Sequence, residues 1–236
     1  MKLSVIIPVR NEEFLIEKII NQLQNKLKVI PFEIIFINDF STDNTVKITE
    51  ELVKNNSGIN IYNNDRKGLG GAITEGINRA TGEVVCIMMS DLSDSTDDLV
   101  NYYNIIKSDN VDAVFGSRFT KGAEIINYPK KKLILNRIFN IVTKLLFFSD
   151  YNDFTNAFKI YKKDALIKTF PIVSESFNVF LELPLKIISR KMKYKIIPIS
   201  WINRKEGSSK FDIKELRAKY LFTLIYCLLE KILLKK

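Results

Sequence analysis

Asp91 and Asp94 directly follow an apolar run at 83–89, at the point where a buried strand would end. Carboxylates are poor core residues, and open α/β sheets bind ligands beyond the carboxyl ends of their strands. Hard oxygen ligands suit Mg²⁺ or Mn²⁺ carrying a phosphate. The segment therefore predicts a metal and phosphate site, although Met89 stands where a second carboxylate would complete an Asp-x-Asp pair.

A second acidic strand end and a glycine-rich segment accompany this site. Asp39 follows the apolar run 33–37, and residues 68–71 contain three glycines. Glycine lets the backbone approach a ligand closely, and a helix that follows offers free N–H groups to a phosphate or a sugar hydroxyl. In a mostly parallel sheet, all three segments are expected to meet in one crevice.

The elements that must position these residues alternate along the chain. Apolar runs of strand length are separated by stripes of helical period, which predicts an α/β fold with a mostly parallel central sheet. The expected strands are 3–9, 33–37, 59–62, 83–89, 112–116, 157–161 and 194–200. The expected helices are 13–27, 45–55, 72–80, 96–107, 130–148, 177–190 and 212–236.

Composition narrows the possible chemistry. A chain of 236 residues with 46% hydrophobic content is expected to form one compact domain. The absence of histidine excludes histidine zinc sites, histidine general bases and Ser-His triads. The two cysteines, Cys86 and Cys227, fall in apolar segments and no secretory signal is visible, so we expect a reducing compartment.

Charge divides the chain into two unlike parts. The first 118 residues contain 12 Lys and Arg against 17 Asp and Glu, a net charge of −5, whereas the remainder contains 24 against 10, a net charge of +14. Such a basic surface suits nucleic acid or an anionic membrane, and no nucleic-acid motif is present. The helices 130–148 and 212–236 are basic and amphipathic, which favours contact with a membrane or a partner; packing on the sheet is the alternative.

The motifs in this order resemble the inverting family 2 glycosyltransferases of GT-A fold, and among them the dolichyl- or polyprenyl-phosphate sugar synthases. The resemblance extends from Val5 to about Phe211. The segments that carry it are IIPVRNE at 6–12, NDFSTDNT at 38–45, KGLGGA at 67–72, SDLSD at 90–94, GSRF at 116–119, DFTNAFK at 153–159 and NRKEGSSKF at 203–211.

The resemblance implies where a nucleoside diphosphate sugar binds. It assigns base and ribose binding to Pro8, Asn11, Glu12 and Asp39, with Lys67, Gly68 and Gly70 completing the donor site. For Asn11 and Glu12 the alternative is helix capping, and for Asp39 a turn with Ser41. The base, guanine or uracil, stays open.

The resemblance also places Mg²⁺ or Mn²⁺ on Asp91, bridging the donor's diphosphate, with Ser93 or Asp94 supplying a further oxygen. Met89 replaces the usual first aspartate of the motif and cannot bind a hard cation. This departure weakens the expectation of tight metal binding by the protein alone.

For the acceptor, the resemblance points to cations. A lipid monophosphate arrives as an anion and needs only to be held in line, whereas an alcohol needs a carboxylate to remove its proton. Asp153 is expected either to act as such a base or to hold neighbouring residues. The expected acceptor residues are Arg118, Lys132, Asp153, Arg204, Ser209 and Lys210, and the expected catalytic residues are Asp91, Arg118, Arg204 and Lys210.

Together these features predict sugar transfer from a GDP- or UDP-linked donor to a polyprenyl phosphate, with inversion, at the cytoplasmic face of a membrane. Residues 1–211 would form the transferase domain, with a nucleotide-sugar half at 1–118 and an acceptor half at 119–211. Residues 212–236 would form a helix that contacts the membrane or a separate membrane subunit. The alternatives are transfer to a saccharide or lipid-linked saccharide, and a silent nucleotide-sugar-binding subunit; nucleic acid is not an expected partner.

Overall fold

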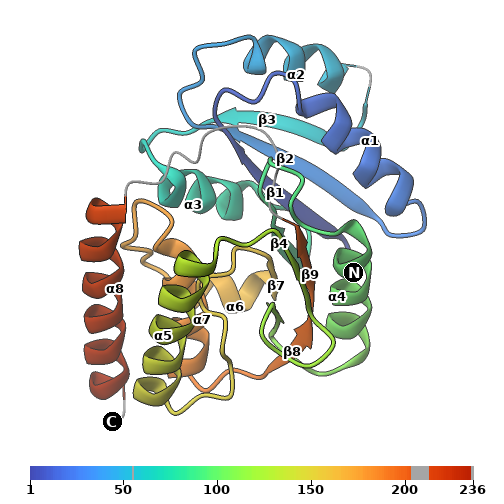
Figure 1. The fold of residues 1–236 in the computed structure, drawn as a ribbon. Coiled ribbons are helices and arrows are strands. Elements are labelled where there is room, and N and C mark those ends of the chain that lie inside the picture. Colours follow the sequence, from blue (N-terminus) through green and yellow to red (C-terminus); the bar gives the residue numbers. More distant parts are fainter. Residues whose placement is uncertain (55, 203–212, 235–236) are drawn as a thin grey trace.

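The computed structural model describes residues 1–54, 56–202 and 213–234. A seven-stranded sheet lies at its centre, with strand order β3-β2-β1-β4-β7-β5-β8 (Figure 1). The strands are β1 Leu3–Val9, β2 Phe32–Asn38, β3 Ile59–Asn63, β4 Val84–Ile87, β5 Ala113–Ser117, β6 Glu124–Ile126, β7 Lys159–Lys162, β8 Tyr194–Pro198 and β9 Ser200–Ile202. The helices are α1 Ile16–Lys26, α2 Thr45–Lys54, α3 Leu69–Arg79, α4 Thr96–Ser108, α5 Lys130–Phe147, α6 Lys163–Ile167, α7 Val179–Ser189 and α8 Ile213–Leu233.

The first half of the chain follows the predicted alternation closely. β1 is buried along its whole length and pairs in parallel with both β2 and β4. Its apolar side chains face helices on both sides of the sheet, which explains why the sequence shows a continuous apolar run rather than an alternating one. The α/β class and the mostly parallel sheet are confirmed.

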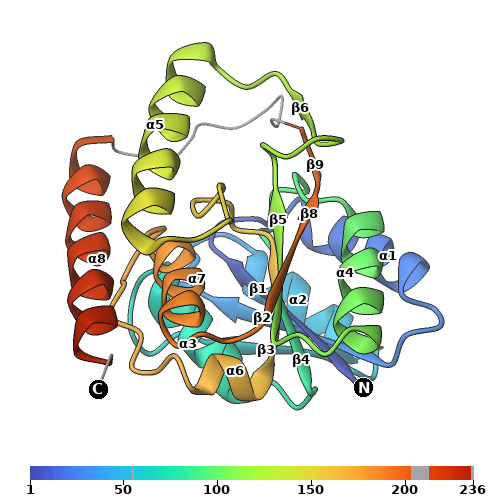
Figure 2. The same cartoon turned by 90° about the horizontal axis from the view of Figure 1, so that it is seen from below.

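The sheet is not parallel throughout, because β7 runs antiparallel to both β4 and β5. One apolar core lies between the sheet and α1 and α4, and the other lies between the sheet and α3, α6 and α7. α5 and α8 contribute Phe147, Leu224 and Cys227 to the second core and lie outside α7 (Figure 2). The strand β7, from the second half of the chain, therefore lies between two strands of the first half.

Two predicted elements differ from the structure, and two short elements were not predicted. The expected strand 194–200 is two strands, since β8 pairs with β5 whereas β9 pairs with β6 in a separate two-stranded sheet. The expected loop 68–71 is mostly helix, because α3 already begins at Leu69. The short elements β6 and α6 were not predicted, since three to five residues are too few to show a period.

α5 and α8 leave most of their apolar side chains exposed. The apolar helix face consists of Ile134, Leu135, Ile138, Ile141, Val142, Leu145, Leu146 and Phe148 together with Leu221, Phe222, Ile225, Leu229, Ile232, Leu233 and Leu234. The two helices are in contact through Phe139 and Tyr220, whose ring centroids are 5.8 Å apart. Most of their apolar residues therefore do not pack on the sheet. Within the described ranges, each helix is too short or too polar to cross a bilayer.

Candidate functional site

Asp39 joins the end of β2 to the glycine turn, which we define as residues 68–71. Its Oδ1 accepts hydrogen bonds from Gly68 N and Asn64 Nδ2, each at 2.8 Å, and its own N–H donates to Val9 O. Asn64 also donates to Gly68 O. One carboxylate oxygen thus fixes the glycine turn while the other accepts no hydrogen bond within the described chain, which suits a ligand hydroxyl or base.

The glycines of this turn are explained first by packing. A Cβ atom on Gly70 would lie 1.8 Å from Ser174 O, and one on Gly68 would lie 2.5 Å from Glu175 O. Gly70 N donates to Glu175 O at 3.1 Å, and Gly68 has a φ of 110° that favours glycine. Close approach to the backbone of 174–175 accounts for these glycines, whether or not a ligand also binds here.

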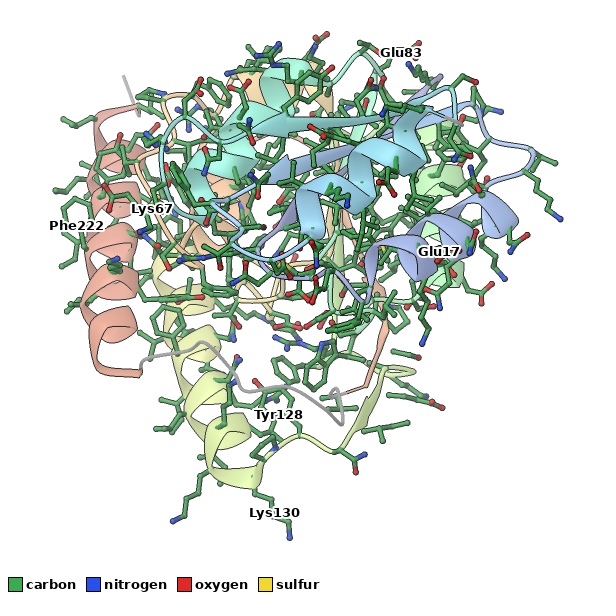
Figure 3. The ribbon with its side chains drawn as sticks, turned by 90° about the horizontal axis from the view of Figure 1, so that it is seen from above. Glu17, Lys67, Glu83, Tyr128, Lys130 and Phe222 are labelled. Atoms are coloured by element: carbon green, nitrogen blue, oxygen red, sulfur yellow. The ribbon has the colours of Figure 1, made fainter. Side chains whose placement is uncertain are left out.

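The other predicted donor residues lie at the same edge of the sheet. Asn11 Oδ1 accepts from Thr42 N at 2.7 Å, and Glu12 N donates to Thr45 Oγ1 at 2.8 Å, so both residues connect the loops after β1 and β2. Pro8 is buried in β1, whereas Lys67 is exposed beside the glycine turn on the side of α8 (Figure 3). The structure brings all four to one edge and gives Asn11 a loop-bridging role.

Asp91 and Asp94 occupy the turn after β4. Asp91 Oδ1 accepts from Ser93 N at 3.1 Å and from Ser93 Oγ at 2.6 Å, which fixes the turn. Asp94 is 8% exposed and accepts from Met89 N at 3.3 Å. Burial, together with the negative charge of Asp91, raises the pKa of Asp94 to about 7. Two carboxylates therefore lie together at the predicted position.

Arg118 and Asp153 form a buried ion pair at the end of β5. Asp153 is fully buried and accepts from Arg118 N, Nε and Nη2 at 2.9, 2.8 and 2.7 Å. Burial opposes the positive charge of Arg118, but the negative charge of Asp153 and its hydrogen bonds hold the pKa of Arg118 above its usual value. The guanidinium also lies within 6 Å of the ring centroids of three aromatic residues: Phe119 at 5.4 Å, Tyr128 at 5.7 Å and Trp201 at 5.8 Å.

Trp201 connects the acidic turn with this ion pair. Its backbone forms an isolated bridge with Asp94, while its ring faces Arg118. Arg118 and Lys159 are both close enough to counteract the rise in the pKa of Asp94. The acidic turn and Arg118 therefore share one electrostatic environment.

Lys132 lies close enough to Arg118 for the charge of the guanidinium to affect it. Partial loss of solvent and this charge together lower the pKa of Lys132. Its neighbour Lys130 extends from the start of α5, and Tyr128 precedes it (Figure 3). Arg204, Ser209 and Lys210 fall outside the described residues, so their predicted roles stay predictions.

Several residues of this region were missed from the sequence. Asn64 directly follows β3, and the rule that placed Asp39 and Asp91 at strand ends also applied to it. Lys159 gave no such signal, since it lies within a strand; it is 1% exposed, donates to Phe154 O at 3.2 Å and to Asn156 O, and burial lowers its pKa to about 7. Trp201 reaches the site only because 194–200 divides into two strands.

Few side chains at this site could bind a metal ion. Within the described ranges no group of three or more His, Cys, Asp or Glu is arranged to hold an ion. Asp91 nevertheless has one oxygen outside the Ser93 contacts, and the pKa of Asp94 is raised by burial and by the charge of Asp91, which a cation would neutralise. The residues fit a divalent cation shared with a phosphate ligand, and Asp91 offers an oxygen to it.

Comparison with known protein families gives one match over most of the chain: residues 4–170 match the family described as glycosyl transferase family 2. Among curated proteins, the chain is 27% identical over 218 residues to dolichol-phosphate mannosyltransferase of Pyrococcus furiosus, covering 91% of this chain and 60% of that protein. It is 24% identical over 220 residues to glycosyltransferase AglD of Haloferax volcanii, covering 90% of this chain and 35% of that protein. The chain thus spans about 60% of the length of the first relative and about a third of the length of the second.

Solved structures give a consistent fold. Glucosyl-3-phosphoglycerate synthase of Mycobacterium tuberculosis in complex with UDP has a TM-score of 0.72 at 16% identity, covering 96% of this chain and 80% of that one. The same enzyme with Mn²⁺, UDP-glucose and phosphoglyceric acid has a TM-score of 0.73 at 15% identity, covering 96% and 79%. This likeness confirms the GT-A fold.

Proposed function

The chain belongs to glycosyl transferase family 2, and from this membership we propose that it transfers a sugar from a nucleoside diphosphate sugar to a polyprenyl phosphate, with inversion. That it is a glycosyltransferase follows from the family and the named relatives. The polyprenyl phosphate acceptor is the finer part of the proposal. Similarity to dolichol-phosphate mannosyltransferase of P. furiosus, whose name includes a lipid phosphate, supports it.

The proposal of a phosphate acceptor rests on the hydrogen bonds of Asp153. Its side chain is fully buried and both of its oxygens accept hydrogen bonds from Arg118, so it is poorly placed to remove a proton from an alcohol. Arg118 Nε and Nη2 donate to Asp153, whereas Nη1 donates no hydrogen bond within the described residues. A cation fixed in this way suits an acceptor that is already an anion.

In the proposed reaction an oxygen of the lipid phosphate attacks the anomeric carbon from the face opposite the nucleoside diphosphate. The new carbon–oxygen bond forms as the bond to the diphosphate breaks, and the diphosphate leaves with the electron pair. Arg118 holds the acceptor phosphate in line, and Asp153 holds Arg118. Asp39 and the glycine turn hold the nucleoside end of the donor.

A divalent cation, Mg²⁺ or Mn²⁺, would be held by Asp91 and the donor's diphosphate, with Ser93 or Asp94 nearby. It would neutralise the charge that grows on the leaving diphosphate. Crystal structures of the M. tuberculosis enzyme contain Mn²⁺, which supports a divalent metal here. GDP- and UDP-linked donors both remain within the proposal.

The decisive experiment is a donor screen followed by transfer. Calorimetry with UDP, GDP and their sugar conjugates, each with Mg²⁺ and with Mn²⁺, would identify the donor. Transfer from the labelled donor to a short-chain polyprenyl phosphate would then test the acceptor. Donor hydrolysis or transfer to a saccharide, with none to any polyprenyl phosphate, would contradict the proposal.

A saccharide acceptor is the second candidate, and Asp94 favours it. This carboxylate is buried next to Asp91, and among the described residues Met89 N alone donates a hydrogen bond to it. It therefore has an oxygen available to remove a proton from a sugar hydroxyl. Transfer to a saccharide that is abolished by Asp94→Asn, with donor binding unchanged, would support this alternative.

We also propose that the enzyme works at the cytoplasmic face of an anionic membrane, with the apolar helix face as its contact. Lys130, Lys131 and Arg137 accompany the exposed apolar residues of α5, a combination suited to anionic headgroups above an acyl layer. Docking on a separate membrane subunit is the alternative occupant of the same face.

Vesicle flotation tests this location. Leu145→Glu and Phe222→Glu, on α5 and α8, should each reduce binding to vesicles that contain anionic lipid. Val29→Glu is the matched control, because Val29 is 92% exposed in the loop between α1 and β2, away from both helices. Equal flotation of all variants would exclude membrane contact through this face.

A further inference from the structure

α8 and the glycine turn are joined by a continuous chain of buried contacts. We propose that Thr223 of α8 is a positioning residue for the donor site, acting through segment 173–178 on Gly68 and Gly70. The inference rests on the proposed function, since it concerns binding of a nucleoside diphosphate. It assigns to α8 a part in donor binding in addition to any contact made by its exposed face.

The first link lies between the glycine turn and segment 173–178. Gly70 N donates to Glu175 O at 3.1 Å, and the carbonyl oxygen of Ser174 lies where a Cβ atom on Gly70 would be. On its other side, the turn is held by Asp39 through Gly68 N at 2.8 Å. Any displacement of 174–175 must therefore move the turn or break its contacts with Asp39.

The second link is a cluster of three buried polar side chains. Asn178 Nδ2 donates to Ser174 Oγ and to Thr223 Oγ1, each at 2.9 Å, and the hydroxyls of Ser174 and Thr223 are 3.4 Å apart. Their residues are 3%, 1% and 0% exposed. Since water cannot easily replace a lost partner here, the Thr223 hydroxyl is needed to satisfy the Asn178 amide.

A third link ties the same segment to α7. Glu182 is fully buried and accepts from Val173 N at 2.9 Å and Ser174 N at 2.7 Å. Lys186 Nζ lies 2.7 Å from Glu182 and 3.8 Å from Glu230, which is on α8. Segment 173–178 is therefore held from both helices, and the contact with α8 can be changed without breaking an ion pair.

α8 thus has two different faces. Leu221, Phe222 and Ile225 are exposed, whereas Thr223 and Leu224 are buried against segment 173–178 and the core. The loop that carries the glycine turn lies on the side of α8 in both Figure 1 and Figure 2. Because coupling between sites is reciprocal, a change in how α8 packs alters donor affinity, and a bound donor stabilises the packing of α8.

The test compares three variants of the full chain. Thr223→Val keeps the shape but removes the hydroxyl, and Thr223→Ser restores it. Thr143→Val is the matched control, because Thr143 is a fully buried helical threonine whose hydroxyl bonds to Phe139 O of its own helix at 2.8 Å. Calorimetry measures binding of UDP and GDP, thermal unfolding measures stability, and transfer assays give KM for donor and acceptor separately.

We expect Thr223→Val to weaken binding of the nucleoside diphosphate by about fivefold or more. Its KM for the donor should rise, the KM for the acceptor should stay unchanged, and Thr223→Ser should restore binding. Thr143→Val should lower stability without a change in donor affinity.

Two results would overturn the inference alone: wild-type affinity in Thr223→Val, or equal weakening in Thr143→Val, which would mean that affinity follows general stability. Absence of nucleotide binding by the wild-type protein would instead overturn the proposed function on which the inference rests.

Discussion

Two buried carboxylates lie at opposite ends of the same sheet, and their surroundings differ sharply. Among the described residues, Glu33, near the start of β2, is 4% exposed and accepts four hydrogen bonds, whereas Asp94, after the end of β4, is 8% exposed and accepts one. The donors to Glu33 are Lys2 Nζ at 2.8 Å, Ser4 Oγ at 2.6 Å, and Thr81 N and Oγ1 at 2.7 and 2.8 Å.

The difference appears in their pKa values. Burial opposes the charge of Glu33, yet its hydrogen bonds, led by that from Lys2, lower its pKa to about 2. Burial and the charge of Asp91 raise the pKa of Asp94 to about 7. A buried carboxylate with all its partners within the protein contributes to the fold, whereas one with few partners retains the capacity to interact with a ligand.

Asp153→Asn should have the largest effect, because Asp153 has its partners within the protein, like Glu33, but lies at the functional end of the sheet. The change leaves the buried Arg118 without a full counter-charge, which costs about 3–5 kcal/mol of unfolding free energy. Transfer should fall by about 100-fold or more, since Arg118 is no longer held.

Urea unfolding and initial rates measure these two effects, with the exposed pair of Asp109 and Lys195 as the reference. Asp109→Asn should change neither quantity appreciably. Full activity in Asp153→Asn would show that the ion pair serves the fold alone.

Asp91→Asn should separate activity from stability. Asp91 is partly exposed, and within the described chain its side chain accepts hydrogen bonds from Ser93 alone. The free energy of unfolding should therefore change by less than about 1 kcal/mol. Transfer should fall by about 100-fold and the dependence of donor binding on Mn²⁺ should disappear. Asp97→Asn, at an exposed carboxylate in α4, should behave like the wild type; unchanged Mn²⁺ dependence in Asp91→Asn would exclude Asp91 as the metal ligand.

The sequence predicted the functional end of the sheet better than the opposite end. Asp39 and Asp91 each follow a strong apolar run and the glycine turn comes after the third predicted strand, so one topological rule was enough to place them together. Glu33 gave no signal of its four hydrogen bonds, because their donors come from two separate segments, Lys2 and Ser4 at the start of β1 and Thr81 before β4, whose meeting depends on strand register.

The sequence also could not distinguish the two reasons for a glycine. Gly70 was interpreted as an approach site for a ligand, whereas the carbonyl oxygen of Ser174 occupies that space. The contact joins residues about a hundred positions apart, and no local pattern encodes it. The antiparallel direction of β7 was likewise hidden, since a strand of four residues fits either direction.

Glu33→Gln should lower stability without a change in transfer. The lowered pKa means that the contribution of Glu33 is present above its unfolded pKa of about 4.5 and is lost as the pH falls toward 2. The variant should therefore unfold more easily than the wild type by about 2 kcal/mol at pH 7, and the difference should vanish near pH 2. Urea midpoints at several pH values measure it, and a difference that does not depend on pH would show that the charge of Glu33 is not the cause.

Asp94→Asn should have a smaller effect on stability than Glu33→Gln, and it should raise the free energy of unfolding where Glu33→Gln lowers it. A carboxyl whose folded pKa of about 7 exceeds its usual 3.8 destabilises the folded state as the pH rises through that interval. Without divalent cations the variant should therefore be more stable than the wild type by on the order of 1 kcal/mol at pH 8, with little difference below pH 4. Transfer to a polyprenyl phosphate should fall by less than about tenfold, because that acceptor needs no base. If Asp94→Asn were instead less stable at pH 8, Asp94 would be satisfied in the same way as Glu33, and the contrast between the two ends of the sheet would fail.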